Sequence, residues 1–465
     1  MLPAGAQDQA ELLFENASTF MNAGKYKDAL SDLESIIRDY GQTPWASKAL
    51  LEIGNYYNLN EDNSEKALSY FDKIQSEYPT SDEAPGAYYF KALIMEQQGE
   101  TVADLESAVA NLIRMQNLYP GNPWRANATH LLGKLAFRLD NYNESLKHFQ
   151  SLEFEHPHTK TLPKTLLMSA KAAWLKGNPK QASLILARLQ SLFPNAPESD
   201  ASQSYLRLMD RFSQGNKVYE LDQPFFGTTP KTYASPTRVC VGTDNLVGVR
   251  DQKGAHLAPL RDYAQRRSVS SKDIVDFCKD RSGSLLLVYQ NRIQSIDGGA
   301  AWPGLSVSGS PLKDISSAAV DDFGRLYVSD TNIRDVAVFS KDGAFLKNLS
   351  VSKAKMVRTF GGEAWVVTGD GSSIIRFDAS FNSREGGLSG LSGIYDFSFD
   401  PYGNIYVLSD KGYAVKVYTY NGTLHTSFNL KGGAFPLKQA TSIGVDASGA
   451  FYLADKKGGA VYRFH

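Results

Sequence analysis

Several classes of protein are excluded by what this chain lacks. It has two cysteines, Cys240 and Cys278, among 465 residues, too few for a disulfide-dense fold, a cysteine-rich zinc module or an iron–sulfur site held by cysteine alone. No apolar run approaches the ~18 residues that a membrane-spanning helix needs. The hydrolase motif GxSxG and the phosphate-loop motif GxxxxGKS/T are missing too. We therefore predict a globular chain with no membrane span.

An excess of charge of one sign is also missing. The 49 basic and 50 acidic side chains give a formal net charge of -1, which argues against a main affinity for nucleic-acid phosphates or anionic lipid. Counted separately, residues 1–215 hold 20 basic and 26 acidic side chains, and residues 216–465 hold 29 and 24. The bulk charge predicts no nucleic-acid partner, although the two parts differ in sign.

The spacing of apolar residues changes once along the chain. From about residue 10 to residue 213 they recur at helical spacing, whereas from about residue 219 they alternate in short runs broken by glycine, aspartate and asparagine. This change places a boundary near Gly215. It predicts a multidomain protein, α then β, with domains at 1–215 and 216–465.

The first domain is built from a helix-pair repeat. A small residue recurs every 37 to 41 positions and is followed by apolar residues four and seven positions later. A small side chain lets two helices cross closely, and a proline after each second helix ends it. We predict five helix pairs and a capping helix over residues 198–213. The small residues are Ala29, Ala67, Ala108, Ser145 and Ala182, and the prolines are Pro79, Pro120, Pro157 and Pro194.

This pattern resembles tetratricopeptide repeats, with Gly54 and Gly133 at the small position of the first helix. Endings such as Leu118-Tyr119-Pro120 are most similar to repeats of bacterial envelope proteins, among them outer-membrane assembly lipoproteins and cell-division coordinators of the periplasm. The resemblance implies an α-α superhelix and a periplasmic or otherwise exported protein whose signal peptide has been removed. Because residues 1–7 carry no such signal, a cytoplasmic location is the alternative.

The second domain repeats as well. Short Asp/Gly turns flanked by apolar strands recur at positions 245, 283, 324, 363, 403 and 449, and six such units predict a six-bladed β-propeller. Residues 320–339, with Tyr-Val-Ser-Asp followed by Asn332-x-Arg334, resemble the NHL-type repeat. The chain ends one strand short of a complete last blade. We expect residues 217–221, or residues 233–235, to supply the missing strand and close the ring.

The two cysteines occupy the same place in adjacent blades, five residues before their turns. Ala319, Ser398 and Gly444 fill that place in three other blades, which indicates a position restricted to small side chains near the channel. Equivalent sites on neighbouring inner strands lie near or beyond the ~7 Å limit for bridging, so two buried free thiols are expected, with a disulfide as the alternative.

A catalytic set is not apparent in the propeller. Lactonases and amidating lyases of similar shape hold a metal in the central channel with carboxylates, asparagine or histidine, but His256, His425 and His465 show no metal-ligand spacing. The repeated Asp330, Asp410 and Asp455 are more simply turn formers that accept backbone N–H bonds. We predict no catalytic residue, no metal, no cofactor and no enzymatic activity. A propeller hydrolase or lyase with a helical targeting domain is the alternative.

Recognition is the function that this inventory favours. In tetratricopeptide stacks the first helices line a concave groove, and this resemblance implies partner-binding residues of which several suit a bound carboxylate. Gly86 and Leu93 stand where the carboxylate-clamping form of the fold has polar residues, which argues against a specific clamp for a C-terminal carboxylate. The alternative is that the lysines form a solvated face and that Tyr89 and Trp174 pack between repeats. The predicted groove residues are Lys48, Asn55, Tyr89, Asn127, His130, Lys134, Lys164, Lys171 and Trp174.

The predicted function is a non-enzymatic protein–protein interaction scaffold of the bacterial cell envelope. Its groove is expected to bind a segment of an envelope or secreted protein. A face of the propeller is expected to bind a second ligand, either another protein or a glycan.

Overall fold

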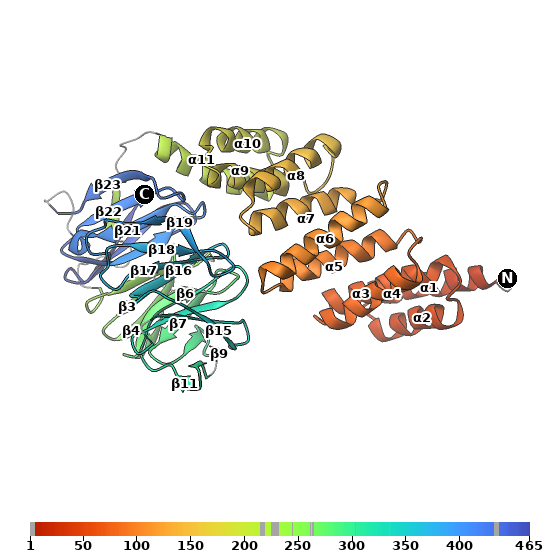
Figure 1. Ribbon diagram of the computed structural model, residues 1–465, viewed down its shortest axis with the longest axis horizontal. Helices are drawn as coiled ribbons and strands as arrows, with labels where there is room; N and C mark the ends of the chain where they lie inside the picture. The colour runs from red at the N-terminus through yellow and green to blue at the C-terminus, as the bar shows by residue number, and fades with distance from the viewer. Residues whose placement is uncertain are drawn as a thin grey trace. The chain divides into compact units, whose positions relative to one another are not determined.

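The computed structural model describes residues 5–213, 219–224, 232–243, 245–260, 262, 265–302, 304–333, 335–431 and 437–465 (Figure 1). The chain divides into two compact units, Met1–Leu162 and Pro163–His465. The division falls inside the helical part of the chain. The last helices therefore belong to the same compact unit as the propeller.

The first unit is a stack of antiparallel helix pairs. Each first helix packs on its own second helix and on the first helix of the next pair, as the repeat spacing predicts. The helices of this unit are α1 (Ala6–Asn22), α2 (Tyr26–Asp39), α3 (Pro44–Leu59), α4 (Ser64–Glu77), α5 (Ala84–Gln98), α6 (Val102–Leu118), α7 (Arg125–Arg138) and α8 (Tyr142–Glu155).

Small residues allow the helices of a pair to approach closely. A Cβ atom on Gly54 would lie 2.4 Å from Cε1 of Phe71, and one on Gly133 would lie 2.3 Å from Cε1 of Phe149. Both distances are too short for real atoms, so glycine is required where the phenylalanine of the second helix crosses the first. The predicted role of these two glycines is confirmed.

Three helices begin the second unit: α9 (Leu162–Leu175), α10 (Pro179–Leu192) and α11 (Pro197–Ser213). Helix α10 starts at a side-chain cap, because Asn178 accepts a hydrogen bond from the backbone N–H of Gln181. Its buried Ala182, Leu186 and Leu189 repeat the spacing of the first unit. The expected capping helix is α11, which packs on α10.

The rest of the second unit is a propeller of six four-stranded antiparallel sheets, as predicted. Blade 1 contains β2 (Arg238–Val241), β3 (Leu246–Asp251), β4 (Gly254–Pro259) and β5 (Arg267–Ser270). Blade 2 contains β6 (Ile274–Lys279), β7 (Leu285–Tyr289), β8 (Ile293–Ser295) and β9 (Ala300–Trp302). A hairpin of β10 (Ser306–Val307) and β11 (Ser310–Pro311) follows blade 2.

The remaining blades follow the same order. Blade 3 contains β12 (Ile315–Val320), β13 (Leu326–Asp330), β14 (Val336–Phe339) and β15 (Phe345–Leu349). Blade 4 contains β16 (Met356–Phe360), β17 (Glu363–Val367), β18 (Ile374–Phe377) and β19 (Ser383–Leu388). Blade 5 contains β20 (Asp396–Phe399), β21 (Ile405–Ser409), β22 (Ala414–Tyr418) and β23 (Leu424–Asn429), and blade 6 contains β24 (Ala440–Val445), β25 (Phe451–Asp455), β26 (Ala460–Phe464) and β1 (Leu221–Pro224).

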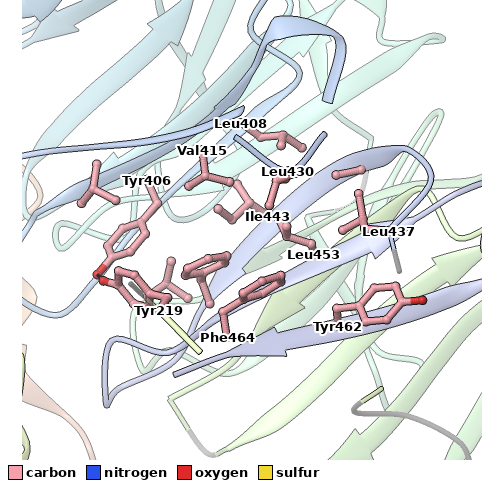
Figure 2. Packing of buried hydrophobic residues seen from close by; sticks show 14 of the residues in the cluster. Tyr219, Tyr406, Leu408, Val415, Leu430, Leu437, Ile443, Leu453, Tyr462 and Phe464 are labelled. Atoms are coloured by element: carbon pink, nitrogen blue, oxygen red, sulfur yellow. Dashed lines mark hydrogen bonds between the residues drawn. The ribbon is translucent and has the colours of Figure 1, made fainter. Parts of the chain in front are cut away.

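The last blade is completed from the start of the domain. Strand β1 pairs antiparallel with β26, and Leu221 lies opposite Phe464. Just before it, the Tyr219 and Tyr406 hydroxyls are 2.7 Å apart inside the core between blades 5 and 6 (Figure 2). The strand thus begins at Leu221, the end of the first predicted segment, while residue 217 lies outside the described residues. The alternative segment at Tyr233 forms no strand.

Two of the three repeated aspartates, Asp330 and Asp455, act as predicted. Asp330 accepts the backbone N–H groups of Lys313 and Asp314, and Asp455 accepts those of Lys438 and Gln439, at 2.8 to 3.1 Å. Asp410 differs, because its carboxylate accepts the hydroxyl of Ser392. Arg334 of the NHL-like motif lies outside the described residues. The carboxylates of Asp330 and Asp455 are fully buried and hold the connections between blades.

Candidate binding groove and propeller channel

Six of the predicted groove residues lie on first helices of the first unit. Lys48 and Asn55 are on α3, Tyr89 is on α5, and Asn127, His130 and Lys134 are on α7. All six side chains are half-buried. The structure thus places them on the helix layer that the repeat pattern assigns to the groove, and their role in binding a partner stays a prediction.

Two equivalent aromatic pairs join neighbouring repeats in this layer. The ring centroids of Phe14 and Trp45 are 5.1 Å apart, and those of Tyr89 and Trp124 are 5.3 Å apart with the rings nearly parallel. Phe14 and Tyr89 each lie three residues before the small position of their repeat, and each tryptophan lies nine before the small position of the next. All four rings are half-buried.

Sequence reasoning missed both tryptophans, although a signal was present. Each follows a proline at the same place in its repeat, in Pro44-Trp45 and in Pro123-Trp124. Lys48 lies with its Nζ 4.1 Å from the Trp45 ring centroid, close enough for a cation–π contact. A Cβ on residue 86 would lie 3.0 Å from Nε1 of Trp124, so Gly86, which departs from the clamp pattern, makes room for that tryptophan.

Lys134 already has a partner within the chain. Its Nζ is 2.9 Å from a carboxylate oxygen of Glu96, and Nη1 of Arg138 is 2.9 Å from the other. The Glu96 side chain is only 4 % exposed, so both cations serve a buried carboxylate. Lys134 is thus paired within the chain, and its predicted role in binding a partner stays a prediction.

The last three predicted groove residues lie on α9, in the second unit. Lys164 is exposed, and Nζ of Lys171 lies 5.2 Å from the ring centroid of Tyr205. Trp174 is 8 % exposed, with its ring centroid 5.4 Å from that of Tyr402 in blade 5. The structure corrects the expectation for Trp174, because this ring packs on the propeller and is closed to a partner.

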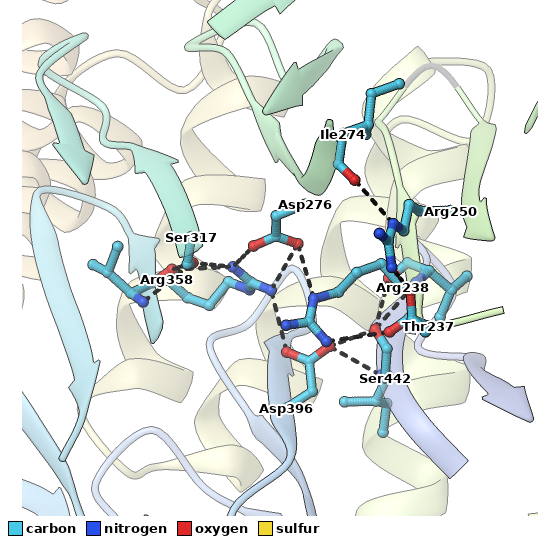
Figure 3. A network of polar contacts seen from close by, with 12 residues as sticks. Thr237, Arg238, Arg250, Ile274, Asp276, Ser317, Arg358, Asp396 and Ser442 are labelled. Carbon is cyan, nitrogen blue, oxygen red and sulfur yellow. Dashed lines mark hydrogen bonds and ion pairs between the residues drawn. The ribbon is translucent and has the colours of Figure 1, made fainter. Parts of the chain in front are cut away.

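The propeller channel holds a polar network that spans the ring (Figure 3). Nη1 of Arg358 is 2.9 Å from Oδ2 of Asp276, and its Nη2 is 3.2 Å from Oδ1 of Asp396. The Arg358 guanidinium also donates to the Ser317 hydroxyl at 3.0 Å. These groups come from the first strands of blades 2, 3, 4 and 5, so one arginine links four blades at the axis.

Two further contacts bring in the remaining blades. Ser442 of blade 6 donates to Asp396 and accepts the backbone N–H of Val239 in blade 1 at 3.1 Å. Nε of Arg238 in blade 1 is 3.5 Å from Oδ1 of Asp276. Every blade therefore contributes to a closed set of buried ion pairs and hydrogen bonds.

Arg358 occupies the position that sequence analysis assigned to small residues. It lies opposite Trp365 in blade 4, as Cys278 lies opposite Leu286 and Gly444 opposite Tyr452 in theirs. Small residues at this place in the other blades leave the axis free for the one long side chain. Burial lowers the pKa of Arg358, but the carboxylates of Asp276 and Asp396 outweigh it, so the pKa rises and the guanidinium stays charged.

The channel residues do not fit a catalytic metal of the kind that propeller enzymes use. Such an ion needs carboxylate, amide or imidazole atoms with free lone pairs, whereas Asp276 and Asp396 face guanidinium groups. In the described part of the chain no three His, Cys, Asp or Glu side chains are grouped to hold a metal ion. Cys240 and Cys278 beside the network are free, and burial raises the pKa of both thiols, so both stay protonated.

Comparison with known proteins gives a match for the N-terminal helices. Residues 6–139 match the outer membrane lipoprotein family YfiO. This agrees with the envelope-type repeats recognised from the sequence. No curated protein matches the chain.

The propeller is similar in fold to solved structures at low identity. A streptogramin B lyase is 11% identical with a TM-score of 0.40, and covers 53% of this chain and 97% of its own. A gluconolactonase from Xanthomonas campestris is 15% identical with a TM-score of 0.42. The match covers 50% of this chain and 87% of the gluconolactonase chain. Likeness at this level says nothing about activity. Among the described helices, none is long and apolar enough to cross a bilayer.

Proposed function

We propose that this protein is a non-enzymatic interaction scaffold of the bacterial cell envelope. The groove of the first unit binds a segment of a partner protein, and the propeller binds a second ligand. The match to an outer membrane lipoprotein family over residues 6–139 supports an exported, periplasmic protein. The location and the partner belong to the proposal.

The observation that carries the groove assignment is the repeated aromatic pair. Tryptophan and tyrosine dominate the energy of protein interfaces because they bury a large area at a small entropy cost. Phe14–Trp45 and Tyr89–Trp124 are half-buried in the free chain and lie two repeats apart, so one extended or helical segment along the groove contacts both. Lys48 beside Trp45 adds a positive charge at one end.

The channel supports a binding role for the propeller over the hydrolase or lyase alternative. The carboxylates at the axis are neutralised by Arg358 and Arg238, which stand where a metal-dependent propeller enzyme places its ion. An arginine held by two carboxylates has no free lone pair and a pKa too high to act as a base. The channel thus stabilises the ring and leaves ligand binding to the propeller surface.

Capture of a partner from native envelope extract tests the groove. Trp45→Ala combined with Trp124→Ala should lower the captured amount at least ~10-fold, the loss expected from two interface aromatics. The matched control is Phe154→Ala, which removes an 88% exposed ring from the second helix α8 of the same unit. Equal capture by both variants and the wild type, with unchanged circular dichroism, would reject the groove assignment.

A further inference from the structure

The near-zero net charge of the chain hides a strong separation of charge across the propeller. In a four-stranded antiparallel blade, the loop between the second and third strands lies at the same end as the connection to the next blade. The first and third hairpin loops lie at the other end. The ring therefore has two ends, and each collects loops from all six blades.

We name the end that carries the inter-blade connections and the loops between second and third strands the basic end. It carries ten exposed lysines, which belong to the inter-blade connections or to the loops between second and third strands. In the described residues, none of the ten forms an ion pair with an acidic side chain. These residues are Lys253, Lys272, Lys313, Lys353, Lys355, Lys411, Lys431, Lys438, Lys456 and Lys457.

Few acidic groups offset these lysines. Asp273, Asp314 and Asp370 are exposed in the same loops, and Asp335 and Asp410 are half-buried. The other carboxylates of these loops are buried, at most 2 % exposed, and accept backbone N–H groups of their own loop or of the neighbouring connection, so they contribute little at the surface. These buried carboxylates are Asp251, Asp330 and Asp455.

The opposite end has the reverse sign. Its hairpins expose Asp297, Asp322 and Asp342 and partly expose Asp262, Asp280 and Asp378, against Arg266, Arg281 and Lys341. The contacts of α9 and α11 with the propeller are at this end. Tyr402 packs on Trp174 and Tyr205, and Leu208 lies where a Cβ on Gly449 would be.

We propose that the basic end docks on an anionic phospholipid bilayer. In the described residues the lysines lie in four of the six connections between blades and in the loops between second and third strands of blades 1, 5 and 6, so they form a plane of charge and not a local groove. A membrane surface meets the whole plane at once, whereas a peptide would meet part of it. Each lysine within a Debye length of the lipid phosphates, ~8 Å at physiological salt, adds to the attraction.

The side-chain types favour lipid headgroups over nucleic acid. Lysine is a compact point charge that suits a diffuse layer of phosphates, while arginine gives the bidentate contacts of specific phosphate sites. Single-stranded nucleic acid also needs stacking platforms, and the described loops of the basic end offer Tyr395 and Tyr413 as their aromatic rings. One of these, Tyr413, lies beside Lys431, whose Nζ is 5.6 Å from its ring centroid.

This inference rests on the envelope location in the proposed function, but it assigns a lipid surface, not a protein, as the ligand of the propeller. It also revises what the net charge of -1 indicated about anionic lipid, because charges at opposite ends of the ring do not cancel for a surface that meets one end.

Sedimentation of the full chain with lipid vesicles tests the proposal. The wild type should bind vesicles that contain phosphatidylglycerol, should not bind pure phosphatidylcholine, and should be released at high salt. Exchanging Lys353, Lys355, Lys456 and Lys457 for glutamate should weaken binding at least ~10-fold. Exchanging only Lys353 and Lys355, or only Lys456 and Lys457, should each cause part of this loss of binding.

The matched control makes the same change of charge elsewhere. Lys25, Lys27, Lys176 and Lys180 are exposed on or beside helices, and glutamate at these four positions should leave vesicle binding within ~2-fold of the wild type. Equal weakening in both variants overturns the proposal, and so does a wild type that ignores anionic vesicles but retains RNA or an acidic protein. The Trp45→Ala/Trp124→Ala variant should bind vesicles normally, so failure of the groove and failure of the basic end are distinguishable.

Discussion

At the scale of single residues, the turn between β20 and β21 shows how one substitution changes a carboxylate. In blade 3 the turn residue Asp321 faces the Arg325 guanidinium, with Nε at 2.7 Å. In blade 5 the corresponding Asp400 receives a hydrogen bond from the Asn404 side-chain amide, also at 2.7 Å, and has no cation beside it in the described structure. Burial raises the pKa of both carboxylates, and it raises that of Asp400 to about 7 even though Asp400 accepts hydrogen bonds from its turn.

This shift predicts a pH-dependent stability. The folded state holds the Asp400 proton more tightly than the unfolded chain, whose pKa is ~3.9, so the stabilisation is complete below that value and is lost as pH rises through about 7. Asp400→Asn should remove this dependence and raise the free energy of unfolding at alkaline pH by roughly 2–4 kcal/mol. The new amide can donate to Oδ1 of Asn404, which is buried without a hydrogen-bond partner.

Denaturant unfolding of both proteins across the pH range checks this. Asp342→Asn, in an exposed turn of blade 3, is the control and should shift stability by less than ~0.5 kcal/mol. Parallel stability curves for wild type and Asp400→Asn would show that Asp400 ionises normally in the folded protein.

At the scale of elements, Arg358 joins the first strands of four blades at the axis. Replacing it by methionine keeps most of the volume but leaves Asp276 and Asp396 buried, each having lost its pairing with the guanidinium. Breaking a buried ion pair from one side costs about 3–5 kcal/mol, and we expect a loss of that size in denaturant unfolding.

Two further variants separate the ion pairs from packing. Asp276→Asn and Asp396→Asn added to Arg358→Met should recover part of the loss, because the buried charges are then gone. Arg292→Met changes an arginine that lies over Tyr289 at the edge of blade 2 and should have an effect within ~0.5 kcal/mol. No recovery in the triple variant would mean that volume and not charge holds the axis.

The elements themselves could be predicted from periodicity, and the contents of the axis could not. Recurring small residues and Asp/Gly turns are local signals, and they predicted the helix pairs and the blades. The closing strand was expected at residues 217–221 or 233–235, and it runs over Leu221–Pro224. Counting five residues back from the turn at 363 reaches Arg358, but the blade 4 turn is shorter, with Phe360 directly opposite Glu363, and an arginine departs from a position that small side chains hold in the other blades. The strand register shows that this arginine replaces a small residue.

At the scale of the whole molecule, surface properties were the hardest to infer. Net charge adds all side chains together, whereas the propeller topology sorts lysines to one end and aspartates to the other. Trp174 likewise fits the groove pattern of its repeat, but α9 belongs to the propeller unit, where a large ring is buried on Tyr402. The position of a residue within its repeat predicts which face of the helix it lies on. Whether that face is exposed depends on what packs against it, which the repeat pattern does not show.

The last prediction concerns the junction of α9 and α11 with the propeller. Trp174→Ala removes a nearly buried ring that contacts Tyr402, and it should lower the stability of the second unit by about 3 kcal/mol and its Tm by several degrees. Leu184→Ala on α10, where the side chain is 72% exposed, is the control and should leave Tm unchanged. Calorimetry measures both, and equal Tm values would show that the ring does not stabilise the junction. Because these contacts are at the end opposite the lysines, Trp174→Ala should bind anionic vesicles as the wild type does.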